Sequence, residues 1–124
     1  MNSAYVLNRY HAVSTSALSK EQLLMRLIAQ AIRDVSEARM LLNGRDFAQK
    51  GERLTHAMAI VDELDNALDH SLASAVTGNL SALYGFLRRE LMRANQQCDP
   101  GACDNAVRVL KQMQNMWTLA IAAR

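Results

Sequence analysis

Apolar residues recur at steps of three and four along most of this chain, which is the spacing of one face of an α-helix. The segment 79–95 shows the pattern most clearly. Its apolar stripe consists of Leu80, Leu83, Tyr84, Leu87, Leu91 and Ala94. The charged positions, which fall mostly off that stripe as a solvated face should, are Arg88, Arg89, Glu90 and Arg93. The segment is therefore predicted to be an amphipathic helix.

Polar and special residues mark where further helices begin and end. Ser19 with Gln22 three residues later is typical of a capping box. Gly44 is expected to take the left-handed conformation that ends a first helix, and Asp46 can cap a second one. Pro100 suits a first helical turn, where its missing N–H costs little. The predicted helices cover residues 19–43, 46–72, 78–97 and 100–122, with a short connection around 73–78.

Helices of this length joined by short links predict an all-α protein, an antiparallel four-helix bundle over residues 19–124. Residues 1–18 lack the helical period, and they predict an irregular or short-helical cap segment at the N-terminus. The composition agrees with this fold class, because 50% of the residues are hydrophobic and there is only one proline. At 124 residues the chain suits a single compact domain.

The formal charge of +2 is small and evenly spread, whereas a nucleic-acid binder should show a basic stripe. No apolar run approaches the roughly 20 residues that a membrane span needs. The first residues also lack the charged start and apolar stretch of a signal peptide. We therefore expect a cytoplasmic protein with no nucleic-acid partner and no membrane insertion.

Enzyme and metal chemistry find little support in the sequence. Cys98 and Cys103 are expected to be free thiols at a helix junction, without the further ligands that a zinc site needs. The Glu-x-x-His motif of helical di-iron sites is absent. Glu52 and His56 are interpreted as an exposed pair on one helix face. A run of carboxylates is interpreted as a solvated face: Asp62, Glu63, Asp65 and Asp69. We expect no catalytic residue, no metal and no cofactor.

The run from Asn79 to Asn95 resembles the third core helix of the flagellin export chaperones, the FliS family. Further segments resemble other family elements: Asn8-Arg9-Tyr10, Ser19–Leu24, Asp62-Glu63-Leu64 with Leu68-Asp69, and Val109–Met113 with Trp117. The segments that depart from the usual family residues are Leu27–Ala31 and Ala73–Thr77. The resemblance covers most of the chain from Tyr10 to Trp117.

This resemblance implies a chaperone that binds the C-terminal segment of flagellin in the cytoplasm and prevents premature polymerisation. It further implies delivery of flagellin to the type III export apparatus, with a component of the export gate as a second partner. The oligomeric state is left open between monomer and homodimer. A divergent adaptor or co-chaperone of flagellar export with a different client is the first alternative, and a small bundle enzyme or metal carrier is the second.

In the family, the second, third and fourth bundle helices build the client groove, and the N-terminal segment can fold back over part of it. The candidate groove residues in this chain are Ile60, Leu64, Leu68, Asn79, Leu80, Leu83, Tyr84, Leu87 and Asn95. Core packing explains the apolar members equally well, and Asn79 and Asn95 also suit a helix start and a helix end. Leu7 and Tyr10 are the candidates for the cap, since an aromatic on a polar tail needs a place to bury its ring.

Overall fold

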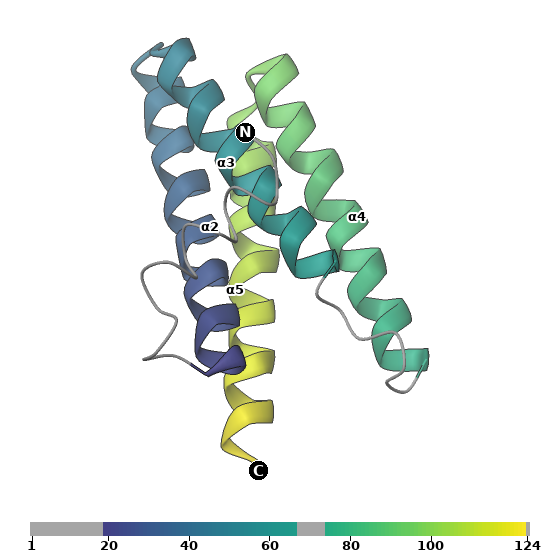
Figure 1. The fold of residues 1–124 in the computed structure, drawn as a ribbon. Helices are drawn as coiled ribbons and strands as arrows, with labels where there is room; N and C mark the ends of the chain where they lie inside the picture. Colours follow the sequence, from purple (N-terminus) through teal and green to yellow (C-terminus); the bar gives the residue numbers. More distant parts are fainter. Residues whose placement is uncertain (1–18, 67–73, 124) are drawn as a thin grey trace.

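The regular elements of the chain are helices packed as a bundle (Figure 1). The computed structural model describes residues 19–66 and 74–123, and only the backbone of residues 74–78. Its helices are α2 (Lys20–Asn43), α3 (Phe47–Asn66), α4 (Ser74–Gln97) and α5 (Pro100–Ala122). Helices α2 and α4 each pack against both α3 and α5, and neighbours run antiparallel. The predicted all-α bundle is confirmed, while the predicted cap segment lies outside the described residues.

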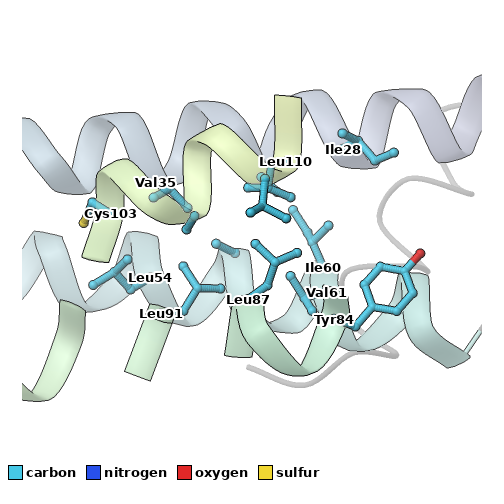
Figure 2. Packing of buried hydrophobic residues seen from close by; sticks show 14 of the residues in the cluster. Ile28, Val35, Leu54, Ile60, Val61, Tyr84, Leu87, Leu91, Cys103 and Leu110 are labelled. Atoms are coloured by element: carbon cyan, nitrogen blue, oxygen red, sulfur yellow. The ribbon is translucent and has the colours of Figure 1, made fainter. Parts of the chain in front are cut away.

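The core is one cluster to which all four helices contribute (Figure 2). Its largest fully buried side chains are Tyr84, Ile28, Leu54, Ile60, Leu64, Leu87, Leu91, Leu110, Met113, Val35 and Val61. Alanines fill the positions between them: Ala31, Ala38, Ala57, Ala59, Ala94, Ala102 and Ala106. Small side chains let helices approach closely, and the larger residues then interdigitate from the facing helices.

The starts of α2, α3 and α5 follow the sequence-based predictions. The backbone N–H of Gln22 donates to Ser19 Oγ (3.2 Å), and the Ser19 N–H donates to Gln22 Oε1 (2.8 Å), which completes the capping box. Asp46 Oδ1 accepts from the N–H of Gln49 at the start of α3 (3.2 Å). Pro100 is the first residue of α5. These contacts satisfy N–H groups that have no partner inside a helix.

The prediction that Gly44 takes a left-handed conformation is wrong. Its φ is −81°, and the left-handed residue is Arg45, with φ of 61°. The N–H of Asp46 donates to the carbonyl of Leu41 (2.9 Å), and that of Arg45 donates to Leu42 (3.1 Å). This pair of bonds is the Schellman arrangement, whose left-handed position is the residue one past the cap. The helix therefore places the strained conformation on an arginine.

The start of α4 differs from the prediction, whereas its end agrees with the predicted range 78–97. The helix begins at Ser74, inside the segment 73–78 that was predicted to be a connection. It ends at Gln97, and the left-handed residue that follows is Cys98 (φ 51°), so Asn95 does not stop the helix. The spacing of apolar residues reports the packed face of a helix, whereas backbone hydrogen bonds decide its ends. Of the predicted second helix, residues 67–72 lie outside the described part of the chain.

Candidate functional site

Most of the apolar groove candidates lie in the interior of the bundle, where α3 meets α4. Ile60 and Leu64 of α3 and Leu80, Tyr84 and Leu87 of α4 all belong to the buried cluster (Figure 2 labels Ile60, Tyr84 and Leu87). Leu83 is half-buried and packs against the same cluster. The structure thus brings the candidates together on neighbouring helices, and their role in binding a client stays a prediction. Leu7, Tyr10 and Leu68 lie outside the described residues.

The two candidate asparagines have different surroundings. Asn79 is exposed near the start of α4. Asn95 is half-buried, and both its carbonyl oxygen and its Oδ1 accept hydrogen bonds from Lys50 Nζ, at 3.0 Å each. The Lys50 side chain crosses from α3 and is itself almost fully buried, with 5% of the residue exposed. Its positive charge lies at the C-terminal end of α4, where the helix dipole favours a cation.

Arg88 joins α3 to α4 on the outer edge of the same seam. Its Nε donates to Asp62 Oδ1 (2.8 Å) and its Nη2 to Asp65 Oδ2 (2.7 Å). Burial acts to lower the pKa of Arg88, and the hydrogen bonds to the two carboxylates outweigh it and raise the pKa. Burial, with a smaller contribution from the charge of Asp65, raises the pKa of the Tyr84 hydroxyl to about 12. Tyr84 is therefore neutral at physiological pH.

Large apolar side chains are exposed on all four helices. They are Met40 on α2, Phe47 on α3, Met92 on α4, and Met116 and Leu119 on α5. The pair on α5 lies beyond Met113, the last buried residue of that helix, and Leu119 is on the opposite side of α5 from the buried Leu110. Between Met116 and Leu119 lies Trp117, half-buried, with its indole Nε1 shielded from solvent and without a hydrogen-bond acceptor among the described residues. A buried indole N–H usually has an acceptor, so this end of α5 offers an unused donor beside exposed apolar surface.

Comparison with known proteins identifies the family. The sequence model of the family described as flagellar protein FliS matches residues 1–124. The chain belongs to the FliS family. It is similar to the flagellar secretion chaperone FliS of Salmonella typhimurium, with 30% identity over 122 residues, 94% of this chain and 90% of the relative. The FliS of Vibrio cholerae is 27% identical over 115 residues (90% and 85%), and FliSB of Pseudomonas aeruginosa 24% over 121 residues (94% and 96%).

These matches confirm the family resemblance read from the sequence, and they make this FliS-family chain a flagellar export chaperone. A chaperone acts through surfaces that bind a protein client, so exposed apolar residues are the relevant chemistry. Within the described residues, no group of three His, Cys, Asp or Glu side chains could hold a metal ion. None of the described helices is long and apolar enough to cross a membrane.

One polar site between α2 and α3 was missed by sequence reasoning. His56, interpreted as half of an exposed pair with Glu52, is largely buried, and its Nδ1 contacts Oδ2 of Asp34 on α2. The Asp34 side chain is only 1% exposed, and its Oδ1 accepts from Gln30 Nε2 (2.9 Å). The signal was available, because Asp34 lies on the same helical face as the apolar residues Ala31 and Ala38. A carboxylate on a buried stripe requires a buried partner.

Both cysteines are free thiols, as predicted. Cys98 is exposed at the α4–α5 junction, and Cys103 is buried in the first turns of α5. Burial, strengthened by the charges of nearby Asp104 and Asp99, raises the pKa of the Cys103 thiol to about 11. Cys103 therefore stays a neutral core residue and contributes packing rather than reactivity.

Proposed function

We propose that this chain binds the C-terminal segment of flagellin in the cytoplasm, keeps it from polymerising early, and delivers it to a component of the flagellar export gate. The observation that carries the proposal is the combination of FliS-family membership with exposed apolar surface on the last turns of α5. A subunit that polymerises through amphipathic termini exposes apolar stripes before assembly. A bundle with uncovered apolar residues can shield such a stripe while the client folds on it.

The burial of each candidate decides how directly it can take part. Leu83 and Asn79 are reachable without a change in the bundle, because the first is half-buried and the second exposed. Ile60 and Leu87 are fully buried, so they support the seam and would touch a client only if α3 and α4 moved apart. Affinity would come from apolar burial at about 25 cal/mol per Å², reduced by the cost of ordering the client.

Titration of the full chain with a peptide from the flagellin C-terminus tests the proposal. Trp117 is the chain's single tryptophan and lies between the exposed Met116 and Leu119, so its fluorescence reports on this end of α5. We expect heat release, a gain of helix in the peptide and a changed Trp117 emission. Absence of heat and of helix gain would instead favour an adaptor with a different client.

Tyr10 provides a second test, although it lies outside the described residues. The N-terminal cap proposal expects Tyr10→Ala to change the affinity for the flagellin peptide more than it changes the melting temperature. Phe47→Ala is a suitable control, because Phe47 is an exposed aromatic on α3 and not a cap candidate. An unchanged dissociation constant together with a lowered melting temperature for Tyr10→Ala would show that Tyr10 is structural.

A further inference from the structure

Arginines and apolar side chains that are exposed or half-buried share one face of α4 and α5. On α4, the exposed Arg89 lies three residues after the half-buried Phe86, and the half-buried Arg93 lies seven residues after it, so the three form one stripe. The opposite flank of this helix faces α3, because it carries Arg88 and Asn95, which bond to α3 side chains. The stripe therefore lies on the α5 side, where Arg93 Nε approaches Oδ2 of Asp99, next to the start of α5, at 3.2 Å.

A matching stripe runs along α5. Asp104 reaches Arg39 of α2 at 3.1 Å. Arg108, Leu119 and Met116 then follow around the helix toward the flank that packs against α4. We call the two stripes together the basic–apolar face. Its members are Phe86, Arg89, Arg93, Arg108, Met116 and Leu119.

The charge on this face is not balanced by the chain itself. Within the described helices, α4 carries one acidic residue, Glu90, and α5 one, Asp104. Both already have partners, since Glu90 pairs with Arg93 (3.0 Å) and Asp104 with Arg39. Arg89 and Arg108 are exposed and have no carboxylate partner in the described part of the chain, where Arg108 bonds only to the amide oxygen of Asn105 (3.2 Å).

The order of residues along the face gives it a direction. The arginines lie toward the α4–α5 junction, whereas Met116 and Leu119 lie toward the end of α5 (Figure 1). From Arg108, which has no carboxylate partner among the described residues, to Leu119 is a rise of about 17 Å at 1.5 Å per residue. A segment that matches this part of the face is thus an amphipathic helix whose contact region covers about 12 residues, with carboxylates near one end and apolar side chains along the rest.

We propose that the basic–apolar face docks an amphipathic helix of this kind, acidic at one end and apolar along its remaining length. The inference rests on the proposed chaperone function, since it names the face and the charge pattern that hold a client helix. Carboxylates from the partner pair with Arg89 and Arg108, and its apolar residues cover Met116 and Leu119. Charge complementarity of this type selects partners and fixes their register more than it adds affinity.

Two synthetic helices and one double variant test the inference. The first peptide of about 20 residues has a leucine stripe with glutamates at one end, and the second replaces the glutamates with lysines. Binding to the full chain is followed by Trp117 fluorescence. We expect the acidic peptide to bind at least roughly tenfold more tightly, with a preference that weakens as salt is added. In Arg89→Glu/Arg108→Glu the preference should reverse.

Arg26→Glu/Arg33→Glu is the control, because it makes the same change in charge with two exposed arginines of α2. It should keep the preference for the acidic peptide. Equal binding of both peptides, binding of neither, or equal behaviour of the two double variants would overturn the inference. So would a homodimer that Arg89→Glu/Arg108→Glu abolishes, or binding to vesicles of anionic lipid in place of the peptides.

The flagellin C-terminal peptide is titrated in parallel so that the two failures can be told apart. If it does not bind the unaltered chain, the proposed function fails. If it binds with equal affinity to the unaltered chain and to Arg89→Glu/Arg108→Glu, the proposed function stands and the basic–apolar face is not where the client helix docks. A loss of roughly tenfold in that double variant alone supports both.

Discussion

The two halves of α5 carry apolar residues at the same helical spacing, yet only one half is sealed. From Ala102 to Met113 the apolar stripe lies in the core cluster. Beyond it, 40% of Met116 and 71% of Leu119 are exposed, and Trp117 is only half-buried. Trp117 and Ile121 continue the stripe at steps of four from Met113 and are only half-buried, so the difference between the halves arises from which neighbours reach each one. Leu119 lies on the opposite side of α5 from Leu110 and faces away from the core. The first half of α5 thus stabilises the bundle, whereas its second half leaves apolar surface open to solvent.

Several of the polar contacts between helices lie near the sealed half. Lys50 joins α3 to Asn95 near the end of α4, Arg39 joins α2 to Asp104 of α5, and Arg93 reaches Asp99. These contacts surround the α2–α3 and α4–α5 junctions. Among the residues that the structure describes, no hydrogen bond or ion pair joins the side chains of Met116, Trp117 or Leu119 to another helix. This arrangement predicts that stability and client binding depend on different ends of the bundle.

The largest change in stability is expected when two leucines of α5 are compared. Leu110 is fully buried in the sealed half and Leu119 is 71% exposed in the other. Leu110→Ala should lower the free energy of unfolding by about 2–5 kcal/mol, because it leaves a cavity in the core. Leu119→Ala should change it by less than about 0.5 kcal/mol. Urea denaturation monitored by circular dichroism measures both values.

The same pair separates stability from binding. Leu119→Ala should weaken client binding at nearly unchanged stability, and Leu110→Ala should do the reverse once the protein is kept below its melting temperature. Equal losses of stability in the two variants would mean that the end of α5 is packed as firmly as its beginning. The comparison between the halves would then be wrong.

Lys50 tests the polar contacts of the sealed end. Lys50→Ala removes the donor for two oxygens of Asn95 and the apolar stem that crosses the seam. Acceptors left without partners cost about 1–3 kcal/mol, so we expect a loss of that size in thermal or urea unfolding. Lys111→Ala is the control, because Lys111 is exposed on α5. A loss no larger than the control's would show that the contact is a surface interaction of little value.

A smaller effect is expected at the α2–α3 junction. Arg45→Gly should stabilise the chain by about 0.5–1 kcal/mol, since φ of 61° suits glycine and strains other residues. Gly44→Ala should also stabilise it by about 0.4–1 kcal/mol. Its φ is −81°, and an added Cβ would meet its nearest neighbours at an ordinary 3.8 Å. If Gly44→Ala destabilises the chain, the left-handed residue is Gly44 after all.

Some features of the helix ends could be predicted from the sequence, and others could not. Caps such as Ser19 and Asp46 depend on residues three apart, so short-range chemistry was enough to place the starts of α2 and α3. The left-handed residue at Arg45 depends on how the chain leaves the helix, and the general preference for glycine pointed one residue too early. Local pattern also assigned His56 to a surface pair, because its partner Asp34 lies on another helix.

For the candidate groove residues, the sequence predicted the apolar face but not its burial. Spacing alone identified Leu80, Tyr84 and Leu87 as one apolar face, and that face exists. It could not say whether the face is covered by the chain itself, because burial depends on the packing of α3 and α5 around it. Conversely, Trp117 and Ile121 extend the stripe of α5 at steps of four from Met113 and look like core residues in the sequence, yet both are only half-buried. Only the position of the neighbouring helices reveals this partial exposure.

The smallest expected effect concerns Glu63, a largely buried residue on α3. Burial, with a smaller contribution from neighbouring Asp62, raises its pKa above the ordinary value of 4.5. The folded state therefore binds the proton more tightly than the unfolded state does. Stability from this residue is fully present below about pH 4.5 and is lost as the pH rises through the folded pKa.

Glu63→Gln removes that loss, because the amide stays neutral at every pH. Its melting temperature should exceed that of the unaltered chain at pH 7, and the difference should shrink toward zero as the pH falls to the ordinary pKa of glutamate and below. Glu52→Gln, an exposed site on the same helix, should show no such trend. A melting-temperature difference for Glu63→Gln that stays constant from pH 7 down to about pH 4 would mean that the carboxylate is solvated in the folded state. The α3 side of the bundle would then be more open than the burial of Glu63 indicates.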